Sequence, residues 1–199
     1  MCLKPIIKAG GCLVFIVIPL VIFAIYWANR EDDVVFPDPE NSPYCLPWEA
    51  GKSYWCIQGV GGIVSHHGSS RYAYDFYMPE GTEVRAAREG KVVKVVQEHT
   101  DHGYKKPNNL VAIEHSDGTW AYYGHIQQQG SKVAVGDKVK QGQAIALSGH
   151  VGHSLVPHLH FQVMDGKTRT TLPASFADVT RDGGVPRMFR RYTSRNEPK

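Results

Sequence analysis

The chain has 199 residues, enough for one ordinary domain and an additional segment, and its 42% hydrophobic and 21% charged residues are ordinary for a globular protein. The formal net charge is only +3, whereas nucleic-acid-binding domains usually carry a concentrated basic face, so we expect no nucleic-acid partner. The 20 glycines and 12 prolines are spread along the chain, a distribution that favours an all-β domain with many turns.

A long apolar segment lies near the start of the chain. Residues 9–29 contain no charged side chain and are about long enough to cross a bilayer as one helix, which takes roughly 20 residues. Two lysines precede the segment, whereas one arginine and three acidic residues follow it, so the positive-inside rule places residues 31–199 outside the cytoplasm. A cleaved signal peptide is the alternative, but the apolar run is long for one and ends at Trp27 without a small-residue cleavage site. We expect a cell-membrane protein with a single transmembrane helix within residues 1–30 and a periplasmic or otherwise extracytoplasmic domain.

The rest of the chain divides by composition. Residues 31–44 are acidic and rich in proline, which is typical of a short linker. We expect the folded domain to occupy residues 45–180. Residues 181–199 are rich in arginine and are predicted to be a solvated basic tail, with a weak attraction to anionic wall polymers or lipid headgroups as an alternative.

Two cysteines, Cys45 and Cys56, lie beyond the apolar segment. In an oxidising compartment we expect them to form a disulfide. Closing a loop of this size would stabilise the domain by about 3 kcal/mol in the chain-entropy model. Two reduced, buried thiols are the alternative.

Short runs of β-branched and aromatic residues, bounded by turn signals, predict antiparallel strands. The residues 116–118, Ser-Asp-Gly, are typical of a hairpin turn, and no helical period runs through the region. We therefore expect an all-β domain built on an antiparallel sheet. The predicted strands lie at residues 72–77, 84–87, 91–96, 110–115, 119–125 and 157–161, with two more within 133–149.

The predicted strand at 157–161 carries His158 and His160, two residues apart. Side chains at i and i+2 of a strand point to the same face, so both imidazoles can reach one small volume. This geometry suits a metal site. On its own the pattern is weak, since two exposed strand histidines would give the same sequence.

An aspartate among aromatic residues strengthens the metal hypothesis. Asp75 lies within the run 72–77, where a carboxylate would lose hydration unless it were paired, hydrogen-bonded or bound to a metal. A glycine-rich loop before it carries His66 and His67, and either histidine could join Asp75 and His160. Two nitrogens and one oxygen form a ligand set that leaves zinc an open position for water.

Six short motifs together resemble the lysostaphin-type (LytM-like) zinc endopeptidases of bacterial cell walls. Any one of them is weak, but they occur in order over about residues 46–176. They are Ser65-His66-x-Gly68, Tyr72-Ala73-Tyr74-Asp75-Phe76, Ala86-Ala87-Arg88-x-Gly90, Tyr123-x-His125, Gly136-Asp137-x-Val139 and His158-x-His160-Phe161.

The resemblance implies a LytM-like antiparallel sheet or flattened barrel with a zinc ion in the active site. It places the zinc ligands at His66, Asp75 and His160, and two further active-site histidines at His125 and His158. In the commonest form of the family the first ligand lies four residues before the aspartate, and that position here is Arg71. The spacing in this chain resembles another branch of the family, which assigns His66 as the ligand and leaves His67 as the fallback.

The predicted chemistry follows from such a ligand set. Zinc with three protein ligands lowers the pKa of its water to about 7. Since the chain has no His-Glu-x-x-His helix to supply a glutamate base, His125 and His158 would deprotonate and orient the water and stabilise the oxyanion. We expect a zinc metalloendopeptidase that hydrolyses peptide bonds of bacterial peptidoglycan, in a cross-link or a stem peptide.

Two other functions compete with this hypothesis. The first is a catalytically inactive LytM-like regulator that binds and activates a cell-wall amidase, which would make a protein its partner. The second is a biotinyl-type or lipoyl-type carrier domain, whose hairpins resemble the Gly136-Asp137-x-Val139 pattern. A carrier needs a modified lysine at an exposed hairpin tip, and no such context occurs here.

Overall fold

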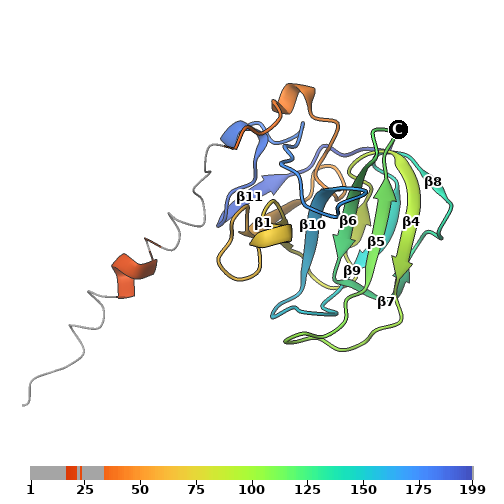
Figure 1. Cartoon of the computed structure of the whole chain (residues 1–199), viewed down its shortest axis with the longest axis horizontal. Helices are drawn as coiled ribbons and strands as arrows, with labels where there is room; N and C mark the ends of the chain where they lie inside the picture. The colour runs from red at the N-terminus through yellow and green to blue at the C-terminus, as the bar shows by residue number, and fades with distance from the viewer. Residues whose placement is uncertain (1–16, 22, 24–33, 199) are drawn as a thin grey trace, which may run out of the picture.

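The β-branched and aromatic runs of the sequence form strands in the computed structural model, which describes residues 17–21, 23 and 34–198 (Figure 1). The strands are β1 (Ser53–Gln58), β2 (Tyr74–Tyr77), β3 (Glu83–Arg85), β4 (Gly90–Val96), β5 (Leu110–Glu114), β6 (Thr119–Gly124), β7 (Ile126–Ser131), β8 (Lys138–Val139), β9 (Ala144–Ser148), β10 (His158–Asp165) and β11 (Arg190–Thr193). Within the domain the helical pieces are short 3-10 turns: η1 (Pro39–Asn41), η2 (Gly68–Ser70) and η3 (Asp182–Gly184).

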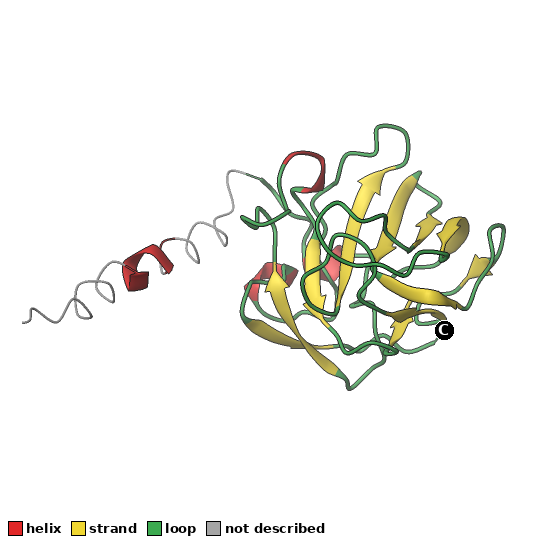
Figure 2. Ribbon diagram, turned by 90° about the horizontal axis from the view of Figure 1, so that it is seen from below, coloured by secondary structure: helices red, strands yellow, loops and turns green. Residues whose placement is uncertain are grey.

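The strands form two antiparallel sheets. The larger sheet has eight strands in the order β11-β1-β2-β10-β6-β5-β4-β8, and the smaller has three in the order β3-β9-β7. Figure 1 shows β10 beside β6 and β5, and Figure 2 shows that strands and loops make up almost all of the domain. The predicted all-β antiparallel fold is confirmed.

The alternation of side chains along β10 separates the core from the site. Leu159, Phe161 and Val163 are buried in the hydrophobic core. His158 and His160 therefore project from the opposite face of the sheet. Each fully buried apolar side chain contributes about 1.5–3 kcal/mol, so the core fixes the orientation of the strand that carries the histidines.

An aromatic cluster fixes β2 relative to β10. The ring of Phe176 lies 5.4 Å from that of Tyr74 on β2 and 5.5 Å from that of Phe161 on β10. The Tyr74 hydroxyl donates a 2.6 Å hydrogen bond to the carbonyl of Ala174. As a result, the segment after β10 holds in place the two paired strands that carry Asp75 and His160.

The predicted transmembrane helix falls mostly outside the described residues. Of the segment 9–29, only residues 17–21 and 23 are described, and they are helical. Within the described part of the chain, no helix is long and apolar enough to span a membrane. The membrane span stays a prediction.

The arginine-rich segment 181–199 differs from the solvated tail that composition suggested. Its strand β11 pairs with β1 in antiparallel register. Tyr192 is buried, and the buried side-chain amide of Asn196 donates to the carbonyls of Leu46 and Ala86 at 3.0 and 3.1 Å. The described part of this segment therefore belongs to the folded domain.

The predicted disulfide between Cys45 and Cys56 is absent from the described residues. The buried thiol of Cys56 donates instead to the carbonyl of Gln58, 3.4 Å away within the same β1 region. The backbone N–H of Cys45 is held by the carbonyl of Ala87, at the end of the β3 region. The structure therefore does not support the predicted bridge.

Candidate active site and metal centre

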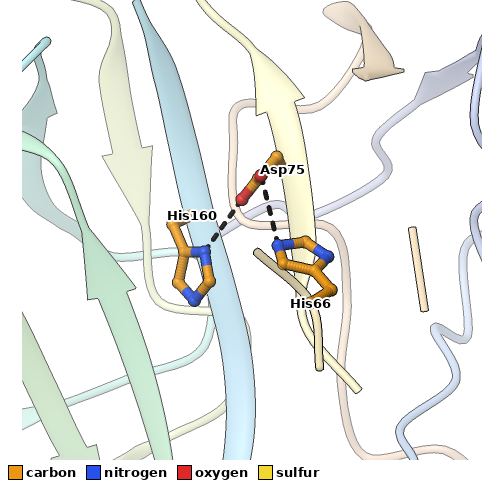
Figure 3. A group of neighbouring side chains, drawn as sticks. All are labelled: His66, Asp75 and His160. Carbon is orange, nitrogen blue, oxygen red and sulfur yellow. Dashed lines mark hydrogen bonds and ion pairs between the residues drawn. The ribbon is translucent and has the colours of Figure 1, made fainter. Parts of the chain in front are cut away.

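Three side chains from separate parts of the sequence converge on one point (Figure 3). Asp75 on β2 and His160 on β10 are directly opposite in the strand register, and His66 comes from the loop between β1 and β2. One possible ligand atom from each lies within 4.8 Å of the others. His67 is exposed and lies outside this group, so the structure brings the first-choice histidine, and not the fallback, to the aspartate.

The tautomer of His66 leaves a lone pair facing the aspartate. Its Nδ1–H donates to the carbonyl of Gly59 at 2.8 Å, so Nε2 carries no proton in the neutral ring. That Nε2 is buried, has no hydrogen-bond partner and lies 3.1 Å from Asp75 Oδ2. An unpartnered lone pair directed at a carboxylate oxygen is stabilised by a cation between them, so these residues fit a metal ion.

His160 is oriented by a glutamine on its own strand. Its Nε2–H donates a hydrogen bond to Gln162 Oε1 at 3.0 Å, and its Nδ1 lies 2.8 Å from Asp75 Oδ1. Burial alone lowers the pKa of His160, but the hydrogen bond and charge of Asp75 outweigh it and raise that pKa. In the metal-free chain this hydrogen bond holds the pair together, and a cation between the two groups can take its place.

Asp75 is ionised despite its burial. Burial opposes the charged form, but the nearby His66 and the hydrogen bond with His160 outweigh it and hold the pKa of Asp75 well below its usual range. A carboxylate and two imidazoles match the nitrogen and oxygen ligands that zinc accepts.

Gln58, which sequence reasoning missed, supports both the aspartate and the loop. Its Nε2 donates to Asp75 Oδ2 at 2.9 Å and to Ser65 Oγ at 2.7 Å. Its Oε1 accepts the backbone N–H of Val64 at 3.0 Å. A register shift in β1 between Cys56 and Gln58 sets Gln58 opposite Asp75, and no local sequence pattern announces that shift.

His125 and His158 lie next to the proposed ligands. Their ring centroids are 4.4 Å apart, and His158 Nε2 is 3.6 Å from Asp75 Oδ1. Each Nδ1 contacts a backbone carbonyl, of Val151 for His125 at 2.7 Å and of Val156 for His158 at 2.8 Å, so the neutral rings carry their proton on Nδ1 and a lone pair on Nε2. Burial lowers the pKa of both rings, that of His125 to about 3, so both are neutral at pH 7.

Asn108 is a second residue that the sequence did not reveal. His125 has a left-handed backbone conformation with φ of 61°, which residues other than glycine rarely adopt. Asn108 Oδ1 accepts the backbone N–H of His125 at 3.0 Å, while Asn108 Nδ2 donates to the Tyr122 hydroxyl at 3.1 Å. The Asn108 side chain therefore stabilises the backbone conformation that positions His125.

A cavity of about 160 Å³ opens onto these groups. Exposed apolar side chains at its rim, such as Val64 and Leu155, provide contact surface for a substrate. The residues that line it are Ile57, Gln58, Val64, Ser65, Asp75, His125, His153, Ser154, Leu155, Val156, His158 and His160.

The fold and the site define an antiparallel β-domain with a candidate His-Asp-His metal site on one face of its sheet. Residues 69–172, just over half of the chain, match the model of peptidase family M23, and the chain belongs to this family. The predicted resemblance to lysostaphin-type proteins is thereby confirmed.

Curated relatives and a solved structure agree with this assignment. The chain is 40% identical over 99 residues to the glycyl-glycine endopeptidase ALE-1 of Staphylococcus capitis, a match covering 49% of this chain and 25% of ALE-1. It is 38% identical over 105 residues to the peptidoglycan DD-endopeptidase ShyB of Vibrio cholerae, covering 53% of this chain and 22% of ShyB. The catalytic domain of a mutant of the prophage-encoded M23 protein EnpA from Enterococcus faecalis superposes with a TM-score of 0.51 at 25% identity, covering 68% of this chain and 98% of that one. The matches span a quarter or less of these two relatives.

Proposed function

We propose that the chain is a zinc-dependent metalloendopeptidase that hydrolyses peptide bonds of bacterial peptidoglycan, in a cross-link or a stem peptide. The observation that carries the proposal is the buried, unpartnered Nε2 of His66 facing the ionised Asp75, with His160 closing the group. Membership of peptidase family M23 and the printed activities of ALE-1 and ShyB support the reaction and the substrate class.

His66, Asp75 and His160 would hold the zinc ion. Bound there, zinc would supply a water whose pKa is about 7 and would polarise the scissile carbonyl. Gln58 and Gln162 hold the ligands in place through their hydrogen bonds to Asp75 and His160.

His125 and His158 perform the proton transfers. Because each Nδ1 faces a backbone carbonyl, each neutral ring presents an Nε2 lone pair that can accept a proton from the attacking water. A ring that has gained this proton can donate it as a hydrogen bond to the oxyanion and then pass it to the leaving amine. Two imidazoles side by side allow one to act as base while the other orients the reacting groups.

We also propose that the chain is anchored in the cell membrane with its folded domain outside the cytoplasm. The uncharged segment 9–29 supports a membrane anchor, and the charge distribution around it supports an extracytoplasmic, periplasmic domain. In that position the domain would face its peptidoglycan substrate directly. A regulatory protein partner that covers or opens the site is compatible with this arrangement.

Mass spectrometry of fragments released from purified peptidoglycan tests the proposal. The full chain in detergent, loaded with zinc, is incubated beside the His158→Ala variant and the control His67→Ala, whose altered side chain is exposed and outside the site. New amino and carboxyl ends made by the unmodified chain and the control, but not by His158→Ala, identify the peptidase and its bond. No release by a chain that holds stoichiometric zinc would contradict the proposal and favour the inactive regulator of a wall amidase.

A further inference from the structure

A second hollow lies on the face of the sheet that carries the metal centre. It has a volume of about 460 Å³ and runs over β10, β6, β5 and β4, which lie side by side in Figure 1. We call it the outer groove. Its lining residues are Val93, Lys94, Leu110, Ala112, Trp120, Tyr122, Met164 and Arg169.

The strand register shows that the outer groove continues from the metal centre. On β10, Gln162 and Met164 follow His160 at steps of two and therefore share its face. Gln162 pairs with Tyr122 on β6, in the groove lining. The Tyr122 ring stands perpendicular to that of His160, with centroids 5.9 Å apart. Tyr122 is thus a wall shared by the metal centre and the groove.

Buried apolar side chains form part of the floor of the groove. Leu110, Ala112 and Met164 are nearly fully buried, so they present only the tops of their side chains. Trp120 and Tyr122 supply aromatic surface between them. An extended peptide can lie on such a surface with its backbone along the sheet.

Two cations border this floor. The Arg169 guanidinium carbon lies 3.4 Å from the centroid of the Trp120 ring, and a stacked guanidinium keeps its N–H edge available for an acceptor. Lys94 is exposed on β4 and lines the same groove. Among the described residues, no ion pair is formed by either Lys94 or Arg169.

The acids near the groove are already engaged. Glu114 accepts the indole N–H of Trp120 at 3.3 Å and stands opposite Lys91 in the strand register. Asp165 accepts backbone N–H groups of its own turn, from Lys167 at 2.9 Å and from the following residue at 2.7 Å. Both acids keep their charge in these hydrogen bonds, but they are outnumbered by three cations, Lys91, Lys94 and Arg169. The groove therefore keeps a net positive charge that a bound anion can neutralise.

We propose that the outer groove binds the part of an extended wall peptide that carries a free carboxylate, with Arg169 and Lys94 as its partners. The inference rests on the proposed peptidase function and specifies the substrate of the same site. In the strand register Lys94 lies level with Gln162, three strands away, and Gln162 lies two residues along β10 from His160. At about 4.8 Å per strand and 3.4 Å per residue, Lys94 is roughly 16 Å from His160. This distance corresponds to about five residues of extended peptide between the candidate metal site and the carboxylate.

Binding without hydrolysis gives the direct test. The zinc-loaded full chain with His158→Ala is titrated into two fluorescent stem peptides that differ only in whether their carboxylates are free or amidated. We expect the free carboxylate to bind about tenfold more tightly, as a charge-assisted hydrogen bond allows. Adding Arg169→Gln and Lys94→Gln should bring the ratio of the two dissociation constants close to one. The control Lys167→Gln alters an exposed cation outside the groove lining and should keep the ratio.

Each outcome is decisive for the groove. A ratio near one in the starting protein, a ratio that survives both substitutions, or failure of both peptides to bind would overturn the inference. Arg169→Lys, which keeps the charge, should retain part of the preference and guards against a folding defect in Arg169→Gln. Peptidoglycan hydrolysis by the unmodified chain is scored separately, so a carboxylate preference without hydrolysis would refute the peptidase and leave the groove standing.

Discussion

Gln58 gives the sharpest test of how the site is built. The change Gln58→Leu keeps the approximate volume but removes the hydrogen bonds to Asp75, Ser65 and the backbone of Val64. The backbone N–H of Val64 and the hydroxyl of Ser65 are partly exposed and can form hydrogen bonds with water instead, but the carboxylate of Asp75 is buried. A hydrogen bond to a charged group is worth about 1.5–3 kcal/mol, so the metal-free chain should lose stability by about that amount.

Zinc affinity should fall together with stability. The loop that carries His66 loses its anchor in Gln58→Leu, so its ordering must accompany zinc binding. Loss of a group that orients metal ligands usually costs 10- to 100-fold in affinity, and we expect a loss of about 30-fold. Competition with a chromogenic chelator measures the affinity, with urea unfolding of the metal-free chain in parallel. The control Gln127→Leu changes an exposed glutamine on β7 and should leave the zinc affinity unchanged. A zinc affinity of Gln58→Leu within threefold of that of the unmodified chain would refute the reasoning.

Three further predictions follow from the same structure. His66→Ala should lose tight zinc binding in the chelator assay while His67→Ala keeps it, and tight zinc in His66→Ala would reject the ligand assignment. Burial lowers the pKa of His125 to about 3, so on acidification the unfolded chain binds a proton at His125 before the folded chain does. Between pH 7 and pH 5 the metal-free chain should therefore lose about 2 kcal/mol more stability than the His125→Gln variant. Equal losses in the two proteins would contradict the lowered pKa. Tyr192→Ala should cost about 3–5 kcal/mol in urea unfolding because a buried aromatic ring is removed, whereas the exposed Thr193→Ala should cost well under half as much, and similar small losses in both would mean that β11 contributes little.

Local sequence patterns predicted most of the strands, although not β1, β7 or β11, and they singled out Asp75 and His160 of the candidate metal cluster. The runs 91–96, 110–115 and 119–125 match β4, β5 and β6 closely, because they are short, rich in β-branched and aromatic residues and bounded by turns. The spacing of His158 and His160 placed both on one face because the side-chain period of a strand is two. Asp75 could be singled out because an ionised group among aromatic neighbours requires a partner.

Features that depend on distant contacts were not predictable from the sequence. Gln58 reaches the site through a shift in the β1 register, and Asn108 through the approach of its loop to β6. The arginine-rich segment looked solvated by composition, yet Tyr192 lies in the core because β1 offers a free edge to β11. The expected bridge failed for the same reason, since the positions of Cys45 and Cys56 are set by separate parts of the fold.

The direct pairing of Asp75 with His160 makes the metal centre a check on correct folding. A slip of one residue between β2 and β10 would set Tyr74 or Phe76 opposite His160 and turn the carboxylate to the other face of the sheet. Such a chain would have no complete ligand set, and so no means of activating water. Under the proposed function, this coupling would keep misfolded copies from hydrolysing peptidoglycan.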